Sequence, residues 1–274
     1  MAVYVDAGAA ADLQAAGGTM IADYGAYALW RVPPSTAVGR EGVTVAGDLD
    51  KIELRDTAIN TADDVEPSVA SDLRDAAGRN GKELRLVQFA GPIKPEWVDG
   101  LRKSGLKIVS YLPPNGYIVL GDASAVQALV TRAASDQLIS FEGPFRPAYR
   151  LEPALAERRD DGGTVDVVVQ VVAGETADLA AVKTLGKTLA QDNTVAGFTN
   201  VELRVSASTL VDLVRLPAVV NVERRQLPKL LDEKQDQILA GNISTVGGKK
   251  VPSSTGYLSW LNGRGLSTNA ANHP

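Results

Sequence analysis

The sequence predicts an α+β fold of tandem ferredoxin-like (βαββαβ) units, in each of which two helices cover one face of a four-stranded sheet. The first observation is the stretch 83–151, where apolar periodicity gives the order strand, helix, strand, strand, helix, strand. The second is that this order returns from residue 165 onward. The third is spacing, because the opening strands begin near residues 3, 84 and 165, 81 residues apart each time. A constant period of this size indicates an internal repeat.

The central stretch, 83–152, gives the most complete copy. Its first helix should end at Gly105, and Asp122 can cap the second. Asn115-Gly116 is expected to supply the positive-φ residues of the turn between the middle strands. The predicted elements are strands at 84–89, 106–111, 117–120 and 138–141, with helices at 92–104 and from 123 through Leu129 and Val130.

The copy at 164–226 opens with the strongest strand signal in the chain, 165–172. A helix is predicted over 178–190, because Leu179, Val182, Leu185 and Leu189 recur at helical spacing. Further expectations are a hairpin of strands 194–198 and 200–205 turning at Thr199-Asn200, a second helix capped by Ser206 or Ser208, and a closing strand at 219–223.

The first copy, 1–61, is expected to be partial. A strand at 3–5, a helix at 9–16 and a hairpin around Gly25 are clear, whereas the second helix, 35–42, is short and flanked by glycine. Residues 43–45 and 52–54 could add strands. A connector at 62–82 should hold one helix, 67–79, and a linker follows Glu152.

The tail, 227–274, is predicted to hold a short helix at 230–240, followed by loop from residue 243. That loop is rich in Gly, Ser, Thr and Asn. We expect it to dock on another surface through Tyr257, Trp260 and Leu261.

Composition excludes several classes of protein. With 45% hydrophobic and 22% charged residues the chain has ordinary globular composition. A formal net charge of −5 argues against a nucleic-acid partner. No apolar run is long enough to span a membrane, so no membrane partner is expected. Cysteine is absent, which excludes disulfides and thiolate metal sites. The N-terminus shows no signal peptide; either the protein is made without one or it has been removed.

Few residues could support catalysis. The single histidine, His273, is next to the last residue, and a chain without internal His or Cys has few routes to acid–base or nucleophilic chemistry. The pairs Asp63-Asp64 and Asp160-Asp161 are expected to be solvated, and Asp48-Leu49-Asp50 lacks the other ligands of a calcium loop. No catalytic, cofactor-binding or metal-binding residue is therefore predicted, and no cofactor.

The remaining features favour a binding protein. A sheet covered by helices on one face leaves its other face free for a partner, and its edges can accept another strand. Aromatic residues are expected in the core rather than in a ligand cage; they are Phe89, Trp97, Tyr111, Tyr117 and Phe141.

Two runs carry a family resemblance: LVQFAGPIKPEW at 86–97 and GLKIVSYLPPNGYIV at 105–119. Together they resemble the N-terminal prosegment, with inhibitor I9-like tandem domains, of certain large subtilisin-like serine proteases (peptidase S8). GTMIADYGAYAL at 18–29 is similar to the segment that precedes it there, and 219–239 resembles the run into the catalytic domain. The similarity covers nearly the whole chain. The family's Asp-Ser/Thr-Gly, His-Gly and Gly-Thr-Ser motifs are missing, so no catalytic residue is carried over.

The resemblance implies an intramolecular chaperone and inhibitor whose partner is the protease domain of the same gene product. Such a prosegment lays its sheet on protease helices and runs a C-terminal arm through the substrate cleft. It also implies a secreted or extracytoplasmic location, and a break in a longer chain at Pro274. The favoured arm consists of Arg224, Arg225, Gln226, Leu227, Pro228, Lys229, Leu230 and Leu231, with 143–151 as the alternative.

Other functions stay open at this point. The chain could be a free-standing protease inhibitor or protein-interaction module without any catalytic domain. It could also be a small-molecule-binding regulatory domain, for which fold alone is the support. Hydrolytic activity of this chain by itself is disfavoured by the missing motifs.

Overall fold

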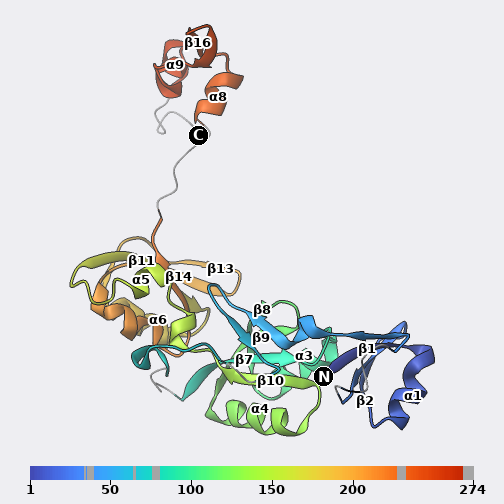
Figure 1. Cartoon of the computed structure of the whole chain (residues 1–274). Helices are drawn as coiled ribbons and strands as arrows, with labels where there is room; N and C mark the ends of the chain where they lie inside the picture. The colour runs from blue at the N-terminus through green and yellow to red at the C-terminus, as the bar shows by residue number, and fades with distance from the viewer. Residues whose placement is uncertain (34, 36–39, 64–65, 76–80, 227–232, 268–274) are drawn as a thin grey trace. The chain divides into compact units, whose positions relative to one another are not determined.

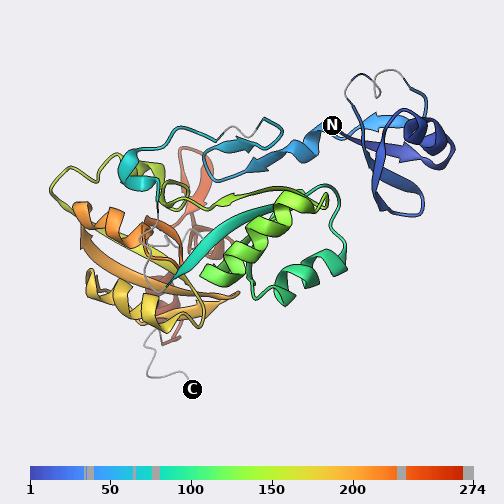
Figure 2. The same cartoon turned by 90° about the horizontal axis from the view of Figure 1, so that it is seen from below.

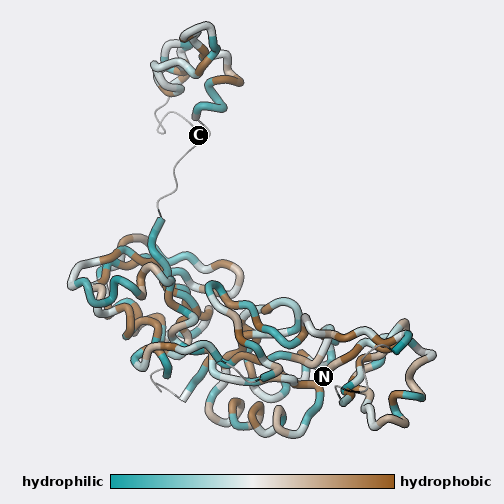
Figure 3. Tube along the Cα trace, in the orientation of Figure 1, coloured by the Kyte–Doolittle hydropathy of each residue, from teal (hydrophilic) through white to brown (hydrophobic). Residues whose placement is uncertain are grey.

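The computed structural model describes residues 1–33, 35, 40–63, 66–75, 81–226 and 233–267 (Figure 1). Two compact units are present, Met1–Arg225 (the main unit) and Gln226–Pro274 (the C-terminal unit). No helix in the described ranges is long and apolar enough to cross a membrane. Hydrophobic and hydrophilic residues instead alternate over short distances along the chain (Figure 3).

Repeat 2 is a complete ferredoxin-like unit. Its four antiparallel strands have the order β10-β7-β9-β8, and α3 and α4 lie on one face of the sheet (Figure 2). Asp122 caps α4 as predicted, accepting a hydrogen bond of 2.8 Å from the Ala125 amide. The elements are β7 (Lys82–Phe89), α3 (Pro95–Lys103), β8 (Lys107–Leu112), β9 (Gly116–Asp122), α4 (Ala123–Ser135) and β10 (Ile139–Pro144).

Repeat 3 has the same topology, with the strand order β12-β14-β11-β15. The residues of β11 alternate between buried and partly exposed, and Val165, Val167 and Val169 are buried in a core that also contains Leu210 and Leu213 of α7. The elements are β11 (Thr164–Val172), α6 (Thr176–Thr184), β12 (Lys187–Thr188), β13 (Asn193–Val195), β14 (Phe198–Ser206), η5 (Ala207–Thr209), α7 (Leu210–Val214) and β15 (Val219–Arg224).

Two local predictions in repeat 3 were wrong. The helix predicted over 178–190 ends at Thr184, so Leu189 lies beyond it. At Gly186 the backbone passes so close to β14 that an added Cβ would lie 2.7 Å from the Arg204 carbonyl oxygen. The hairpin turns at Ala196-Gly197, with φ of 50° and 86°, and not at Thr199-Asn200. Neither predicted serine provides a side-chain cap, since η5 and α7 show no such hydrogen bond.

Repeat 1 has the strand order β2-β3-β1-β4. The fourth strand, which the sequence only allowed as an addition, pairs with β1 through Val43–Val45. Half of the segment expected to hold the second helix, residues 36–39, lies outside the described residues. The elements are β1 (Ala2–Asp6), η1 (Ala7–Ala9), α1 (Ala10–Ala15), β2 (Thr19–Asp23), β3 (Tyr27–Arg31) and β4 (Val43–Val45). The predicted α+β fold of tandem ferredoxin-like units is thus confirmed.

Between repeats 1 and 2 the chain forms η2 (Gly47–Asp50) and a hairpin of β5 (Lys51–Glu53) and β6 (Ala58–Asn60). The hairpin residues Ile52 and Ile59 are buried in one hydrophobic cluster with Leu84 and Leu86 of β7. The hairpin therefore packs against repeat 2. The helix predicted over 67–79 is replaced, in the part that is described, by one 3-10 turn, η3 (Ser71–Leu73).

A buried polar network fixes the hairpin to the sheet. Gln88 of β7 is fully buried; its Oε1 accepts from the Thr61 hydroxyl at 2.6 Å, and its Nε2 donates to the Lys51 carbonyl at 3.0 Å and to Asn115 Oδ1 at 3.1 Å. Asn115 and Gly116 were predicted to supply the positive-φ residues of a turn, which is wrong, because neither has a positive φ. Asn115 is fully buried, and its Nδ2 donates to the Phe89 carbonyl at 2.5 Å.

Replacing Gln88 by Leu tests this network. The substitution preserves volume but leaves the Lys51 carbonyl and the Asn115 side chain without their partner, so we expect a loss of about 1–3 kcal/mol in unfolding free energy. Urea denaturation measures the loss, and amide hydrogen exchange should quicken first in 51–60. Gln127→Leu on the exposed side of α4 is the control. Unchanged exchange in the hairpin would show that the network does not hold it.

The C-terminal unit was predicted as a helix followed by loop, and the loop prediction was wrong. The unit contains α8 (Glu233–Leu239), a hairpin of β16 (Ile243–Val246) and β17 (Lys249–Pro252), and α9 (Tyr257–Gly263). Tyr257 and Trp260 lie on α9 with stacked rings, 6.1 Å between centroids, and the Arg264 guanidinium lies over the Trp260 ring. Local contacts of this kind stabilise the helix.

Candidate functional site

The helix-free sheet faces were the predicted docking surfaces, and in repeats 1 and 2 they are already covered by the chain itself. In repeat 1, Leu29 is fully buried in a cluster that contains Phe89 and Trp97 of repeat 2. The Tyr24 hydroxyl donates to the Pro92 carbonyl at 2.7 Å across the same contact. The helix-free face of repeat 1 therefore packs on repeat 2.

In repeat 2 the helix-free face carries Leu84, Leu86, Ile118 and Leu120, all buried in one cluster with the hairpin and with residues of repeat 3. Such a surface is too apolar to remain in water, and the chain's own segments bury it. The expectation of free faces in repeats 1 and 2 is thus corrected.

The helix-free face of repeat 3 is different, because its side chains are mostly polar and half-exposed. The strand register sets them in rows across β14, β11 and β15, so that Asn200, Gln170 and Asn221 are neighbours. Arg55 of the hairpin reaches one edge of the face, donating to Asn221 Oδ1 at 2.6 Å. We call this surface the polar face; it consists of Asp166, Val168, Gln170, Asn200, Glu202, Arg204, Asn221 and Glu223.

One end of the polar face opens into a cavity of about 340 Å³ that we call the arginine pocket. It is lined by Arg158, Thr164, Val165, Asp166, Arg204, Arg224 and Arg225. Arg204 donates to both Asp166 carboxylate oxygens, at 2.6 and 2.8 Å. This hydrogen bonding, together with the charge of Arg225, lowers the pKa of Asp166, so the pocket's one carboxylate stays ionised at neutral pH.

The predicted docking arm begins at the arginine pocket. Arg224 ends β15 and donates to Glu152, with its Nη2 at 2.7 Å from Oε1, while Arg225 donates to Glu202. Burial raises the pKa of Glu152, but the Arg224 hydrogen bonds outweigh it and the net shift is downward. Gln226 is exposed, and Leu227, Pro228, Lys229, Leu230 and Leu231 lie outside the described residues.

The alternative arm, 143–151, is packed into the main unit. Phe145 and Leu151 are buried, and Leu151 bridges to Val222 of β15. The helix α5 (Pro153–Ala156) follows, with Leu155 fully buried, so the predicted linker also begins as packed structure. This segment connects repeats 2 and 3 through their shared core and cannot serve as a free arm.

Arg150 is the most unusual residue of this connection. It is 1% exposed, and its guanidinium donates to four backbone carbonyls, those of Phe145, Val214, Leu216 and Val219. Burial lowers the pKa of Arg150 to about 9, against an opposing effect of the Glu83 charge. The residue therefore carries its charge at neutral pH, and it ties the end of repeat 2 to the turn after α7.

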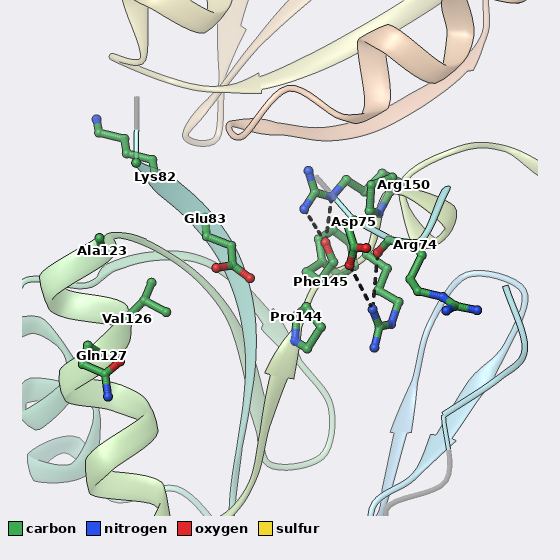
Figure 4. Close-up of a pocket in the computed structure, with 13 residues that line it drawn as sticks. Arg74, Asp75, Lys82, Glu83, Ala123, Val126, Gln127, Pro144, Phe145 and Arg150 are labelled. Carbon is green, nitrogen blue, oxygen red and sulfur yellow. Dashed lines mark hydrogen bonds and ion pairs between the residues drawn. The ribbon is translucent and has the colours of Figure 1, made fainter. Parts of the chain in front are cut away.

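Arg150 also lines the cavity drawn in Figure 4, which has a volume of about 440 Å³. The Glu83 carboxylate and the Arg150 guanidinium lie on opposite sides of this cavity. Its remaining walls come from the start of α4 and from the segments around Asp75 and Pro144.

The predicted aromatic core is confirmed for Phe89, Trp97 and Phe141, which are buried. Tyr111 is an exception, with 48% of its surface exposed. Its ring lies 5.5 Å from that of Tyr117, and both line an open groove beside Pro92 and Pro114. The tail residues Tyr257, Trp260 and Leu261 are half-buried within the C-terminal unit.

The described residues contain no group of three or more His, Asp or Glu side chains close enough to hold a metal ion. Asp63 accepts a hydrogen bond from Asn60 at 2.9 Å, and Asp64 and His273 lie outside the described residues. The described residues offer a polar, half-exposed sheet face with the arginine pocket at one end. The class that fold and site define is a tandem ferredoxin-like protein with one polar, accessible sheet face.

In a comparison with known proteins, one family model matches part of the chain. A model described as "Domain of unknown function (DUF8729)" matches residues 51–150. No curated protein matches. Among solved structures, the chain is similar to the acetolactate synthase small subunit from Thermotoga maritima, with 14% identity and a TM-score of 0.18, over 52% of this chain and 92% of that one.

The ends of the family match coincide with structural features. Residue 51 is the first of β5, and residue 150 is the buried arginine. The matched segment thus comprises the hairpin, the connector, repeat 2 and the connection to repeat 3. It agrees with the packing of the hairpin on repeat 2.

Two sets of residues were not foreseen from the sequence. Arg150 stands in a Pro- and aromatic-rich segment whose pattern indicates only an extended chain. The arginine pocket joins residues that are up to 67 positions apart, from Arg158 to Arg225. Alternation did provide one signal, because Asp166 and Arg204 each occupy a polar position between buried residues of a strand.

Proposed function

We propose that this chain is the non-catalytic N-terminal propeptide region of a subtilisin-like serine endopeptidase, secreted with it and acting as its intramolecular chaperone and inhibitor. The observation that carries the proposal is the polar face of repeat 3, which stays half-exposed while its last strand, β15, leads directly into the predicted arm at Arg224. A sheet face and an arm in this order are what a prosegment needs to lie on a protease and enter its cleft.

The polarity of the face suits a partner that must later be released. Interfaces that form and dissociate are more polar than permanent ones, because each half must also be stable in water. A folded template is of most use to a protease whose sheet depends on contacts between distant residues and folds slowly. The apolar faces of repeats 1 and 2 serve a different purpose, the internal assembly of the main unit.

The test is inhibition of a purified subtilisin-type endopeptidase acting on a chromogenic peptide. We expect the chain to slow hydrolysis and to form a complex on size exclusion. Gln170→Arg, which places a bulky cation in the middle of the polar face, should raise the inhibition constant about tenfold or more. The matched control is Gln127→Arg, because Gln127 is exposed on α4 of repeat 2 and is not part of the polar face. The absence of both inhibition and complex formation would reject the proposal. Hydrolysis of casein by the chain alone would reject a non-catalytic role.

A free-standing interaction module would form the same complex, but its gene would not encode a protease domain. The residues encoded after Pro274 separate the two, because an Asp-Ser/Thr-Gly motif within a few dozen positions supports the propeptide.

A small-molecule regulatory role has one specific observation in its favour, the cavity between Glu83 and Arg150. Calorimetric titration with metabolites tests that role separately.

A further inference from the structure

We propose that the arginine pocket of repeat 3 binds a tetrahedral oxyanion, either inorganic phosphate or the phosphate group of a monoester. The inference is independent of the proposed protease partner, because it concerns binding by this chain alone. It begins from strand register: Asp166 of β11 pairs with Arg204 of β14, and the Arg225 amide donates to the Asp166 carbonyl at 2.9 Å. Two arginines thus flank one aspartate on neighbouring strands.

Two further arginines complete the lining. Arg224 extends from the end of β15, and Arg158 comes from the turn after α5. Of the seven lining residues, four are arginine and one is acidic, and with the partner carboxylates Glu152, Glu202 and Asp161 the cluster holds four positive and four negative groups. The cluster is therefore close to neutral, and its attraction for an anion depends on free guanidinium N–H donors rather than on net charge.

Each guanidinium is held by a carboxylate along one edge. Arg204 and Arg224 use Nε and Nη2 for Asp166 and Glu152, whereas Arg225 and Arg158 use Nε for Glu202 and Asp161. In all four arginines, Nη1 has no hydrogen-bond partner among the residues that the structure describes. The carboxylates fix the planes of the guanidinium groups and so reduce the entropy lost when a second anion binds.

The number of donors favours a compact anion with several oxygens. A phosphate group presents three or four acceptor oxygens in different directions and can accept from several arginines at once, whereas one carboxylate satisfies about two donors. A cavity of about 340 Å³ accommodates phosphate together with part of an attached alcohol. Asp166 lies on the strand side of the pocket with both oxygens bound by Arg204, which limits its repulsion of the ligand.

The experiment is isothermal titration of the purified chain with sodium phosphate, with sodium chloride and sulfate as references at matched ionic strength. Glycerol 3-phosphate is titrated in parallel, and tighter binding than inorganic phosphate would identify a monoester as the better ligand. We expect phosphate to bind and chloride not to bind. In the double variant Arg224→Gln/Arg225→Gln the affinity should fall at least about tenfold.

The matched control is Arg102→Gln on α3, since Arg102 is an exposed, ion-paired arginine outside the pocket. It should bind phosphate as the wild type does. Arg204→Lys keeps the charge but loses the planar fork, and an intermediate affinity is expected. Circular dichroism establishes that each variant is folded. No binding of phosphate by the wild type, or undiminished binding by the folded double variant, would overturn the assignment.

Discussion

Leu86→Lys should leave the main unit unable to fold stably, with a loss of about 4 kcal/mol or more in unfolding free energy. Leu86 lies in the middle of β7 on the helix-free face of repeat 2 and is fully buried. The substitution removes an apolar side chain from the shared core and places an ammonium group among buried apolar side chains. Urea denaturation followed by circular dichroism measures the loss.

The matched control is Val168→Lys, at the corresponding place on the helix-free face of repeat 3. Val168 is half-exposed and lies between Glu202 and Glu223 on the neighbouring strands, so a lysine there remains hydrated and gains opposite charges. Its unfolding free energy should stay within about 1 kcal/mol of wild type. If Leu86→Lys were equally well tolerated, the face of repeat 2 would be open to solvent and our account of the shared core would be wrong.

Arg150→Ala is expected to cost about 3–5 kcal/mol, the second large effect. The loss comes from four backbone carbonyls deprived of their donor and from the space left by a long side chain at 1% exposure. Repeats 2 and 3 should also lose cooperativity, because Arg150 joins the end of one to the turn after α7 of the other. A broadened or divided denaturation curve would show this.

Arg102→Ala is the comparison for Arg150, because its ion pair with Asp99 is exposed to solvent on α3. Exposed pairs contribute little, and a change of no more than about 0.5 kcal/mol is expected. An Arg150→Ala protein as stable as the Arg102→Ala protein would mean that water satisfies those carbonyls as well as the guanidinium does.

The sequence predicted those elements that depend on local pattern. β11 was placed within one residue, since a long β-branched run has few other conformations, and Asp122 was identified as a cap from its position alone. The failures involve distant partners. Asn115 is a residue type that favours turns, yet here it is buried. It forms hydrogen bonds with Gln88, 27 positions away, and with the Leu49 carbonyl, 66 positions away. Leu189 fits a helical period that the close passage at Gly186 interrupts.

The site was less predictable than the fold for the same reason. The sequence indicated open faces, and only the structure shows which of them the chain covers. That outcome depends on the hairpin 51–60, whose short strands gave a weak signal. Arg224 and Arg225 were selected from their position before the tail, and their pairing with Glu152 and Glu202 could not be read from sequence spacing.

The hairpin's place against β7 has a consequence for how such repeats can be exchanged between proteins during evolution. A gene segment that begins at residue 83 would encode repeat 2 without the hairpin that covers it, and Leu84 and Leu86 would be exposed to solvent. We therefore expect recombination to be tolerated where the hairpin 51–60 and the sheet of repeat 2 stay together on one gene segment. Although its repeats follow one another about every 80 residues, the chain should be inherited in pieces larger than one repeat.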